Sequence, residues 1–189
     1  MILTTIGIDY SLTSPALCVH TGDSWNIRNC QFYFLTDKPK YEGKTYQLNG
    51  TLHEEWRCDQ ERYENISEWA MSIIRQHNPR RIVIEGYSFG SKGQVFNLGE
   101  NTGLLKHKLF KDKLSFVVIP PTTIKKFAVG KGNANKDLIE ERFLQESNID
   151  VRKILGMTAK QYNPSSDVAD SYFMAKYAWE LEQNGGEFP

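Results

Sequence analysis

Residues 2–9 read ILTTIGID, a run of apolar and β-branched residues that ends in an acid, Asp9. This composition predicts a strand. Two similar runs follow, PALCVH at 15–20 and IRNCQFYFL at 27–35, and the turn TGDS separates them. Together the three runs predict an antiparallel meander. The next stretch, 37–52, is polar, and we expect a loop or a small hairpin there.

The stretch RIVIEG at 81–86 decides how the sheet continues. Before it, apolar residues at helical spacing predict an amphipathic helix over 55–77. RIVIEG is short and β-branched, as buried parallel strands are, and it also ends in an acid, Glu85. A right-handed helical crossover places this strand parallel to the first strand and beside it. Asp9 and Glu85 should then meet at the sheet edge where open α/β sheets bind ligands.

The rest of the chain completes an α/β pattern. We expect a helix at 95–111, a strand at 115–120, and helices at 122–128, 134–147 and 166–183. The order predicts a three-layer sandwich with helices on both faces of a central mixed five-stranded sheet. That sheet combines a three-stranded antiparallel meander with two parallel strands. With no repeat and no long linker in 189 residues, we expect a single domain over 1–189.

The last predicted helix begins with SSDVADSYFM, residues 165–174, and carries two aspartates. Helix capping explains part of this, because acids favour the first helical turn and Ser165 or Ser166 is a good N-cap. However, apolar and aromatic residues leave little of the first two turns for solvent. Asp167 and Asp170 also share one face, because they are three residues apart.

A shared metal site is the second interpretation of these aspartates. Carboxylates that gather in a poorly hydrated place destabilise the fold unless a cation lies between them. Magnesium prefers such oxygen ligands. If the last helix packs across the sheet edge, a cluster suited to two ions forms from Asp9, Glu85, Asp167 and Asp170.

Bulk composition excludes several classes of protein. Three cysteines without a CxxC pair favour neither a disulfide framework nor a zinc site. No apolar run approaches the length of a membrane span, so we expect a cytosolic protein with no membrane partner. The net charge is zero, yet residues 106–136 carry eight lysines against one acid. This asymmetry is typical of a phosphate-binding face or of a solvated helix face.

Four ordered motifs resemble the RuvC family of Holliday junction resolvases: IGIDYSLTSPALCV, IVIEG, VGKGNANKD and DVAD. The resemblance runs from Ile6 to about Ala178, and the insertion at 36–56 does not align. The segment GYSFGSKGQVFNLGENTG looks more like the bacteriophage branch of the family.

The resemblance implies an RNase H-like fold, a homodimer, and two magnesium or manganese ions per active site. It implies paired nicks in a four-way DNA junction that leave 5′-phosphate ends. By position, the four acidic residues named above match the family's catalytic acids. Expression from a bacteriophage would place the protein in the host cytoplasm.

The resemblance also suggests DNA contacts. Lys125 and Lys136 match lysines near the DNA backbone and the scissile phosphate, where Lys136 would stabilise developing charge. Lys131 has no clear counterpart and is expected only to contact phosphate. Tyr87 and Phe89 are candidates for stacking on unpaired bases, or else for simple packing. Further candidate DNA contacts are Lys92, Lys106 and Lys126.

Other functions stay open at this point. A broad nuclease that debranches forks and flaps has the same site, and a catalytically inactive junction-binding protein has the same fold. An actin-like sugar kinase has a similar opening motif, but it needs two such domains. No HExxH or P-loop motif supports a zinc hydrolase or an NTPase.

Overall fold

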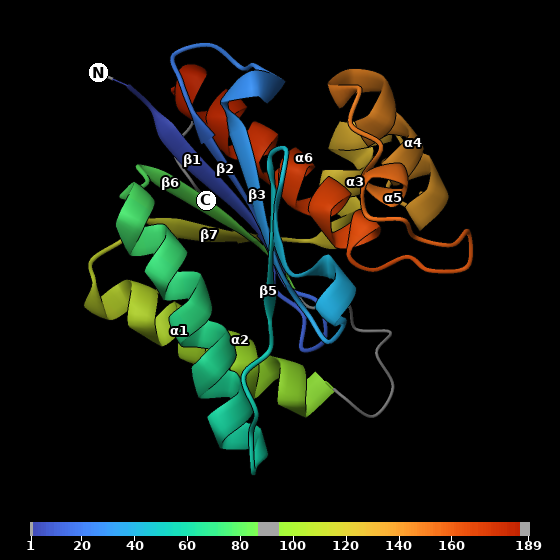
Figure 1. The fold of residues 1–189 in the computed structure, drawn as a ribbon. Helices are drawn as coiled ribbons and strands as arrows, with labels where there is room; N and C mark the ends of the chain where they lie inside the picture. The colour runs from blue at the N-terminus through green and yellow to red at the C-terminus, as the bar shows by residue number, and fades with distance from the viewer. Residues whose placement is uncertain (1, 87–94, 186–189) are drawn as a thin grey trace.

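The computed structural model describes residues 2–86 and 95–185, which fold around one mixed sheet (Figure 1). Within these residues the strand order across the sheet is β4-β5-β3-β2-β1-β6-β7. The strands are β1 Thr4–Asp9, β2 Ala16–Thr21, β3 Cys30–Thr36, β4 Gly43–Thr45, β5 Leu48–Leu52, β6 Arg81–Glu85 and β7 Phe116–Ile119. The α-helices are α1 Asp59–His77, α2 Val95–Lys111, α3 Pro121–Val129, α4 Lys136–Ser147, α5 Val151–Ile154 and α6 Ser165–Gln183.

The predicted α/β class, the meander and the crossover are confirmed. Strands β1, β2 and β3 pair antiparallel in sequence, and β6 pairs parallel with both β1 and β7. In the β1–β6 ladder Ile8 lies opposite Ile84. The next residues along these two strands, Asp9 and Glu85, therefore finish side by side, as the crossover rule predicted.

The predicted count of five strands is wrong, because the polar insertion forms a hairpin that joins the sheet. Strand β5 pairs parallel with β3, and β4 pairs antiparallel with β5. Tyr46 turns the hairpin with a positive φ of 55°. Leu48 and Tyr41 are buried, and the side-chain amide of Asn49 donates to the carbonyl of Phe32 at 2.9 Å. A few apolar anchors are thus enough to hold a polar segment in the sheet.

Helices cover both faces of the sheet (Figure 1). On one face, α1 and α2 pack on Ile6 and Ile8 in an aliphatic core. On the other face, α3, α4 and α6 form a core rich in aromatic residues. Side chains alternate along a strand, so Thr5, Gly7 and Asp9 point toward α6. The period of two thus places the acid of β1 under the last helix.

Close backbone contact fixes α6 on β1. A Cβ atom at Gly7 would lie 2.2 Å from the amide nitrogen of Ala175 and 2.3 Å from the carbonyl oxygen of Ser171. The hydroxyl of Thr5 donates to the carbonyl of Ala175 at 3.3 Å. Only glycine admits this approach, which brings the first turn of α6 over the end of β1.

Two local expectations are wrong. Residues 27–29, expected to start the third strand, form a 3₁₀ turn. Helix α6 begins after Pro164, and neither Ser165 nor Ser166 caps it through its side chain. None of the described helices combines the length and the apolar composition that a membrane span requires.

Candidate active site

The four predicted acids line one pocket of about 370 Å³ where β1, β6 and α6 meet. Asp9 and Asp167 are buried, with 7% and 4% of their surfaces exposed. Glu85 and Asp170 are partly exposed. The pocket is lined by Asp9, Ser11, Thr13, Glu85, Pro121, Lys125, Lys136, Ile139, Asn163, Asp167 and Asp170. Two strands and one helix therefore bring together carboxylates that lie up to 161 positions apart in the sequence.

Burial and mutual repulsion raise the pKa values of these carboxyl groups. Burial raises the pKa of Asp9 well above its usual range, and the charges of Glu85, Asp167 and Asp170 raise it further, while Lys136 opposes them. Burial also raises the pKa of Asp170 well above its usual range, and the charges of Glu85 and Asp167 add to the shift, while Lys136 and Lys125 oppose it. Desolvation and like charges are the conditions that a bound cation relieves.

The pKa of Glu85 is also raised by burial, and a nearby lysine partly offsets this rise. Burial raises its pKa from 4.5 to about 7, Lys125 lowers it, and Asp167 raises it. Lys125 comes from α3, which begins directly after β7, so the sheet also places this cation at the pocket. A site with this balance accepts cationic charge in addition to its lysines.

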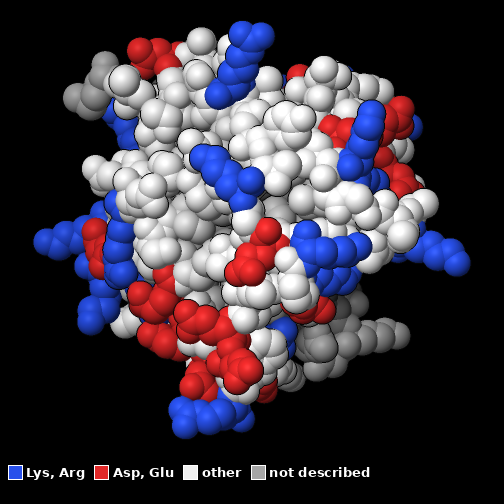
Figure 2. Space-filling view, in the orientation of Figure 1, with Lys and Arg blue, Asp and Glu red and all other residues white. Residues whose placement is uncertain are grey.

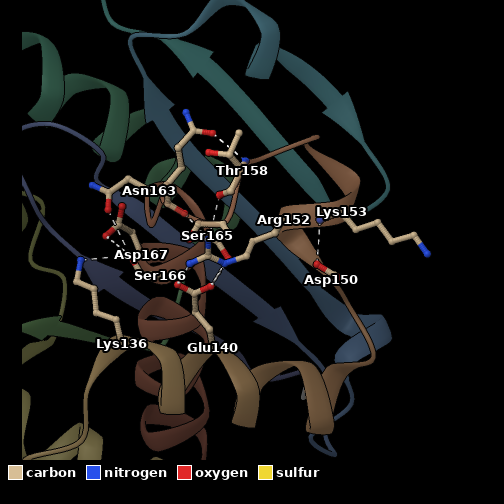
Figure 3. A network of polar contacts seen from close by, with 12 residues as sticks. Lys136, Glu140, Asp150, Arg152, Lys153, Thr158, Asn163, Ser165, Ser166 and Asp167 are labelled. Atoms are coloured by element: carbon tan, nitrogen blue, oxygen red, sulfur yellow. Dashed lines mark hydrogen bonds and ion pairs between the residues drawn. The ribbon is translucent and has the colours of Figure 1, made fainter.

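The hydroxyl of Ser166 links a lysine to the carboxylates (Figure 3). Lys136 Nζ donates to Ser166 Oγ at 3.3 Å. The single proton of that hydroxyl can go to Asp167 Oδ1 or to Asn163 Oδ1, each at 3.3 Å. Ser166 is 1% exposed, so it holds Lys136 from the protein side while the lysine itself reaches solvent.

A salt bridge supports this segment from behind (Figure 3). Arg152 Nε and Nη2 donate to the carboxylate of Glu140 at 2.6 and 3.0 Å. Ser165 Oγ donates to the same carboxylate at 2.9 Å, and Arg152 also donates to the carbonyl of Gln161. Helices α4 and α5 thus brace the loop that enters α6, which positions Asp167.

The donor set fits a divalent cation. Burial raises the pKa of Asp167, and Ser14, Lys136, Ser166 and Asp9 lower it. Even so, Asp167 Oδ2 is buried and has no hydrogen-bond partner among the described residues. An orphaned carboxylate oxygen beside other carboxylates is suited to magnesium or manganese. As the side chains stand over residues 2–86 and 95–185, no group of three or more His, Cys, Asp or Glu residues is placed to hold a metal ion.

The predicted DNA contacts are distributed unevenly. Lys125 and Lys136 line the pocket, whereas Lys126 and Lys131 are exposed outside it. Lys106 lies on α2, on the other face of the sheet, so its predicted role in this site has no support from its position. Tyr87, Phe89 and Lys92 lie outside the described residues.

The lysine-rich segment 106–136 does not form one face, which corrects the simplest interpretation of its charge. Its first lysines belong to α2, and Lys108 pairs with Glu64 and Glu68 of α1 at 2.9 and 2.5 Å. Its last lysines belong to α3, α4 and the loop between them. Figure 2 shows acidic side chains gathered over α1, with Lys and Arg side chains at several other places on that face.

Some residues in the pocket or directly beside it were not predicted. Ser166 looked like a helix cap in the sequence, and Asn163 carried no signal. The buried Ser14 approaches Asp167 closely enough to lower its pKa without completing a hydrogen bond of good geometry to any described residue. Its position five residues after Asp9 is the one signal that could have found it.

Comparison with known proteins identifies the family. The family model described as crossover junction endodeoxyribonuclease RuvC matches residues 47–175. The chain belongs to the RuvC family. RuvC of Chlamydia muridarum is 24% identical over 147 residues, which cover 77% of this chain and 82% of that protein. RuvC of Synechococcus sp. strain CC9311 is 31% identical over 94 residues, which cover 50% and 59%.

Solved structures show the RNase H-like RuvC fold in this chain. Thermus thermophilus RuvC superposes with a TM-score of 0.62 at 17% identity, over 97% of both chains. The same protein in complex with Holliday junction substrate gives 0.61 at 16% identity, over 97% and 96%. A yeast mitochondrial Holliday junction resolvase gives 0.59 at 12% identity, over 97% and 81%. The expectation of a bacteriophage branch stays a prediction.

Proposed function

We propose that this RuvC-family chain is a DNA endonuclease that resolves Holliday junctions and other branched DNA by metal-dependent phosphodiester hydrolysis. The observation that carries the proposal is the gathering of four acids and two lysines in one pocket at the carboxyl ends of β1 and β6. A nuclease needs this combination, because the carboxylates bind cations and the lysines face the anionic backbone. The whole chain, 1–189, acts as one nuclease domain.

Each residue has a proposed role. Asp9, Glu85, Asp167 and Asp170 hold two magnesium ions, or manganese. When bound, such ions activate a water molecule and stabilise the departing oxygen of an in-line displacement.

The lysines of the pocket act on the phosphate. Lys136, held by Ser166, places a positive charge at the scissile phosphate, where negative charge develops. Lys125, from α3, contacts the backbone beside it. Their charge also opposes the repulsion between the carboxylates before DNA binds.

The proposed partners are a four-way junction and a second copy of the chain. A junction presents two equivalent phosphates, and a two-fold homodimer presents two equivalent active sites to them. Such a dimer makes paired nicks that leave 5′-phosphate ends. The proposed compartment is the cytoplasm that holds the DNA, which is the host cytoplasm for a phage-encoded protein.

Cleavage of labelled DNA tests the proposal. Purified protein is incubated with a four-way junction, a fork, a flap and linear duplex, with magnesium or with EDTA, beside an Asp170→Asn variant. We expect symmetric nicks in the junction with magnesium alone, and binding without cleavage in the variant. Undiminished cleavage by Asp170→Asn would refute the carboxylate assignment.

The same experiment separates the alternatives. Equal cutting of forks, flaps and junctions identifies a broad debranching nuclease with the same site. Junction binding without cleavage under either metal identifies a binding protein. Affinity should also fall steeply with salt, because lysines at the pocket displace counterions from the phosphates.

A further inference from the structure

A second pocket lies directly beside the carboxylate site, and the insertion at 36–56 builds much of its wall. Its volume is about 320 Å³, within the range of pockets that bind small ligands. We call it the Trp56 pocket. It is lined by Thr13, Ser14, Thr36, Asp37, Lys38, His53, Trp56, Arg62 and Asn163. Thr13 and Asn163 line the carboxylate pocket as well, so the two pockets are adjacent.

An indole ring held at the mouth of this pocket is its most distinctive feature. Trp56 leaves 41% of its surface exposed, although it is a large aromatic residue. The guanidinium carbon of Arg62 lies 4.7 Å from the Trp56 ring centroid. The His53 ring lies edge-on, with centroids 5.8 Å apart. The ring is therefore held on two sides and still presents open surface.

The residues that hold the ring are themselves fixed to the scaffold. Arg62 Nη2 donates to the carbonyl of Leu12 at 2.8 Å, and His53 Nε2 lies 3.0 Å from the carbonyl oxygen of Thr13. Leu12 and Thr13 belong to the loop that leaves β1 directly after Asp9. The position of Trp56 is thus coupled to the loop that directly follows Asp9, the first of the proposed catalytic acids.

Polar groups in the pocket favour an anionic, hydrogen-bonding ligand. Lys38 and Arg62 supply positive charge, and Asp37 is the carboxylate that opposes them in the pocket wall. Ser14 is 5% exposed, and its hydroxyl has no hydrogen-bond partner within the described part of the chain. An aromatic face beside two cations is the combination that holds a nucleotide.

We propose that the Trp56 pocket binds one unpaired DNA nucleotide next to the scissile phosphate, with its base stacked on Trp56 and its phosphate facing Lys38 and Arg62. The proposal rests on the proposed junction-cleaving function and adds a specificity site to it. At a crossover the base pairs adjoining the exchange point are the easiest to open, because opening there breaks fewer stacking contacts. The pocket would thus select branched DNA over continuous duplex.

The test measures binding and stacking without cleavage. The full chain in EDTA is titrated into a four-way junction, and separately into a single-stranded oligonucleotide, each carrying 2-aminopurine at or beside the crossover sequence. Anisotropy gives affinity, and quenching of 2-aminopurine reports stacking. The variants are Trp56→Ala, Trp56→Leu and Trp56→Phe, with Tyr46→Ala as the control. Tyr46 is an exposed aromatic of the same insertion, 79% exposed at the hairpin turn and outside the pocket.

We expect Trp56→Ala and Trp56→Leu to weaken binding about five- to a hundred-fold, the range that one stacked base supplies, and to remove the quenching. Trp56→Phe should retain most of both, and Tyr46→Ala should match the wild type. Trp56→Leu keeps apolar bulk, so it reports stacking even if the alanine variant unfolds. Wild-type affinity and quenching in Trp56→Leu would overturn the proposal.

Cleavage of an unlabelled junction with magnesium, measured in parallel, tests the proposed function by itself. If the wild type cuts while the Trp56 variants bind and quench normally, the pocket fails and the nuclease stands. If the wild type never cuts but the variants lose stacking, the nuclease fails and the pocket stands.

Discussion

Replacing Glu85 with glutamine should stabilise the metal-free protein. In the folded state burial raises the pKa of this carboxyl from 4.5 to about 7. The charge of Lys125 lowers this pKa and the charge of Asp167 raises it. Between about pH 4.5 and pH 7 the Glu85 carboxyl is therefore ionised in the unfolded chain but largely protonated in the folded protein. The stability that the protonated form contributes is complete below pH 4.5 and is lost as the pH rises through about 7.

The size of the effect follows from the shift. Each pKa unit corresponds to about 1.4 kcal/mol, so ionisation of Glu85 at pH 8 costs the folded state about 3 kcal/mol. Glutamine resembles the neutral form in shape, and Glu85→Gln should recover up to about that amount. For a chain of this length each kcal/mol moves the melting temperature by about 2–4 °C. At pH 5 the gain should shrink to less than about 1 kcal/mol.

Thermal unfolding in EDTA at pH 5 and pH 8 measures how much more stable Glu85→Gln is than the wild type. The same scans with magnesium measure how much the bound cation stabilises each protein. Metal at 100 times its dissociation constant stabilises a folded protein by about 2.7 kcal/mol, and Glu85→Gln should lose most of this. Glu42→Gln, an exposed change in the insertion, is the control and should alter neither scan. A Glu85→Gln protein that melts below the wild type in EDTA at pH 8 would refute the reasoning.

Three further predictions concern the scaffold around the site. Gly7→Ala should displace α6 from β1, which should lower the free energy of unfolding by about 1–3 kcal/mol and abolish DNA cleavage. Unfolding and nicking assays measure the two effects, and full activity would contradict the close contact. Ser166→Ala should free Lys136 and slow single-turnover cleavage about tenfold, while the affinity for the junction is retained. The reason is that one hydrogen bond to a charged group is worth about 1.5–3 kcal/mol. An unchanged rate would remove Ser166 from the site. Glu140→Gln should remove the charge that pairs with Arg152 and lower the free energy of unfolding, measured in urea, by about 1–3 kcal/mol. The control Glu141→Gln should not lower it. Equal effects of the two changes would contradict the bracing role of Glu140.

The sequence predicted the part of the site that regular structure controls. The acids at the carboxyl ends of the two strands and the crossover rule were enough to predict that Asp9 lies beside Glu85. The sequence did not predict that α6 packs across the sheet edge, and the four-acid cluster was expected only if it did. That packing depends on the backbone contact at Gly7, which the periodicity of apolar residues does not reveal.

Other features depended on tertiary contacts that no local pattern records. Residues 37–52 are polar, so the sequence left both a loop and a small hairpin open. It did not show that the hairpin joins the sheet, where Leu48 and Tyr41 are buried. The lysines of 106–136 looked like one basic face, because linear charge does not show that β7 separates α2 from α3. Ser166 resembled a helix cap until its contact with Lys136 was seen.

The most direct test of the central claim is anomalous diffraction from a crystal of the full chain grown with manganese. The account predicts two anomalous peaks per protomer, about 3.5–4 Å apart, held by the carboxylates at the carboxyl ends of β1 and β6 and the start of α6. Those ligands are Asp9, Glu85, Asp167 and Asp170. Well-ordered carboxylates with no manganese between them, or manganese held only elsewhere on the chain, would contradict it.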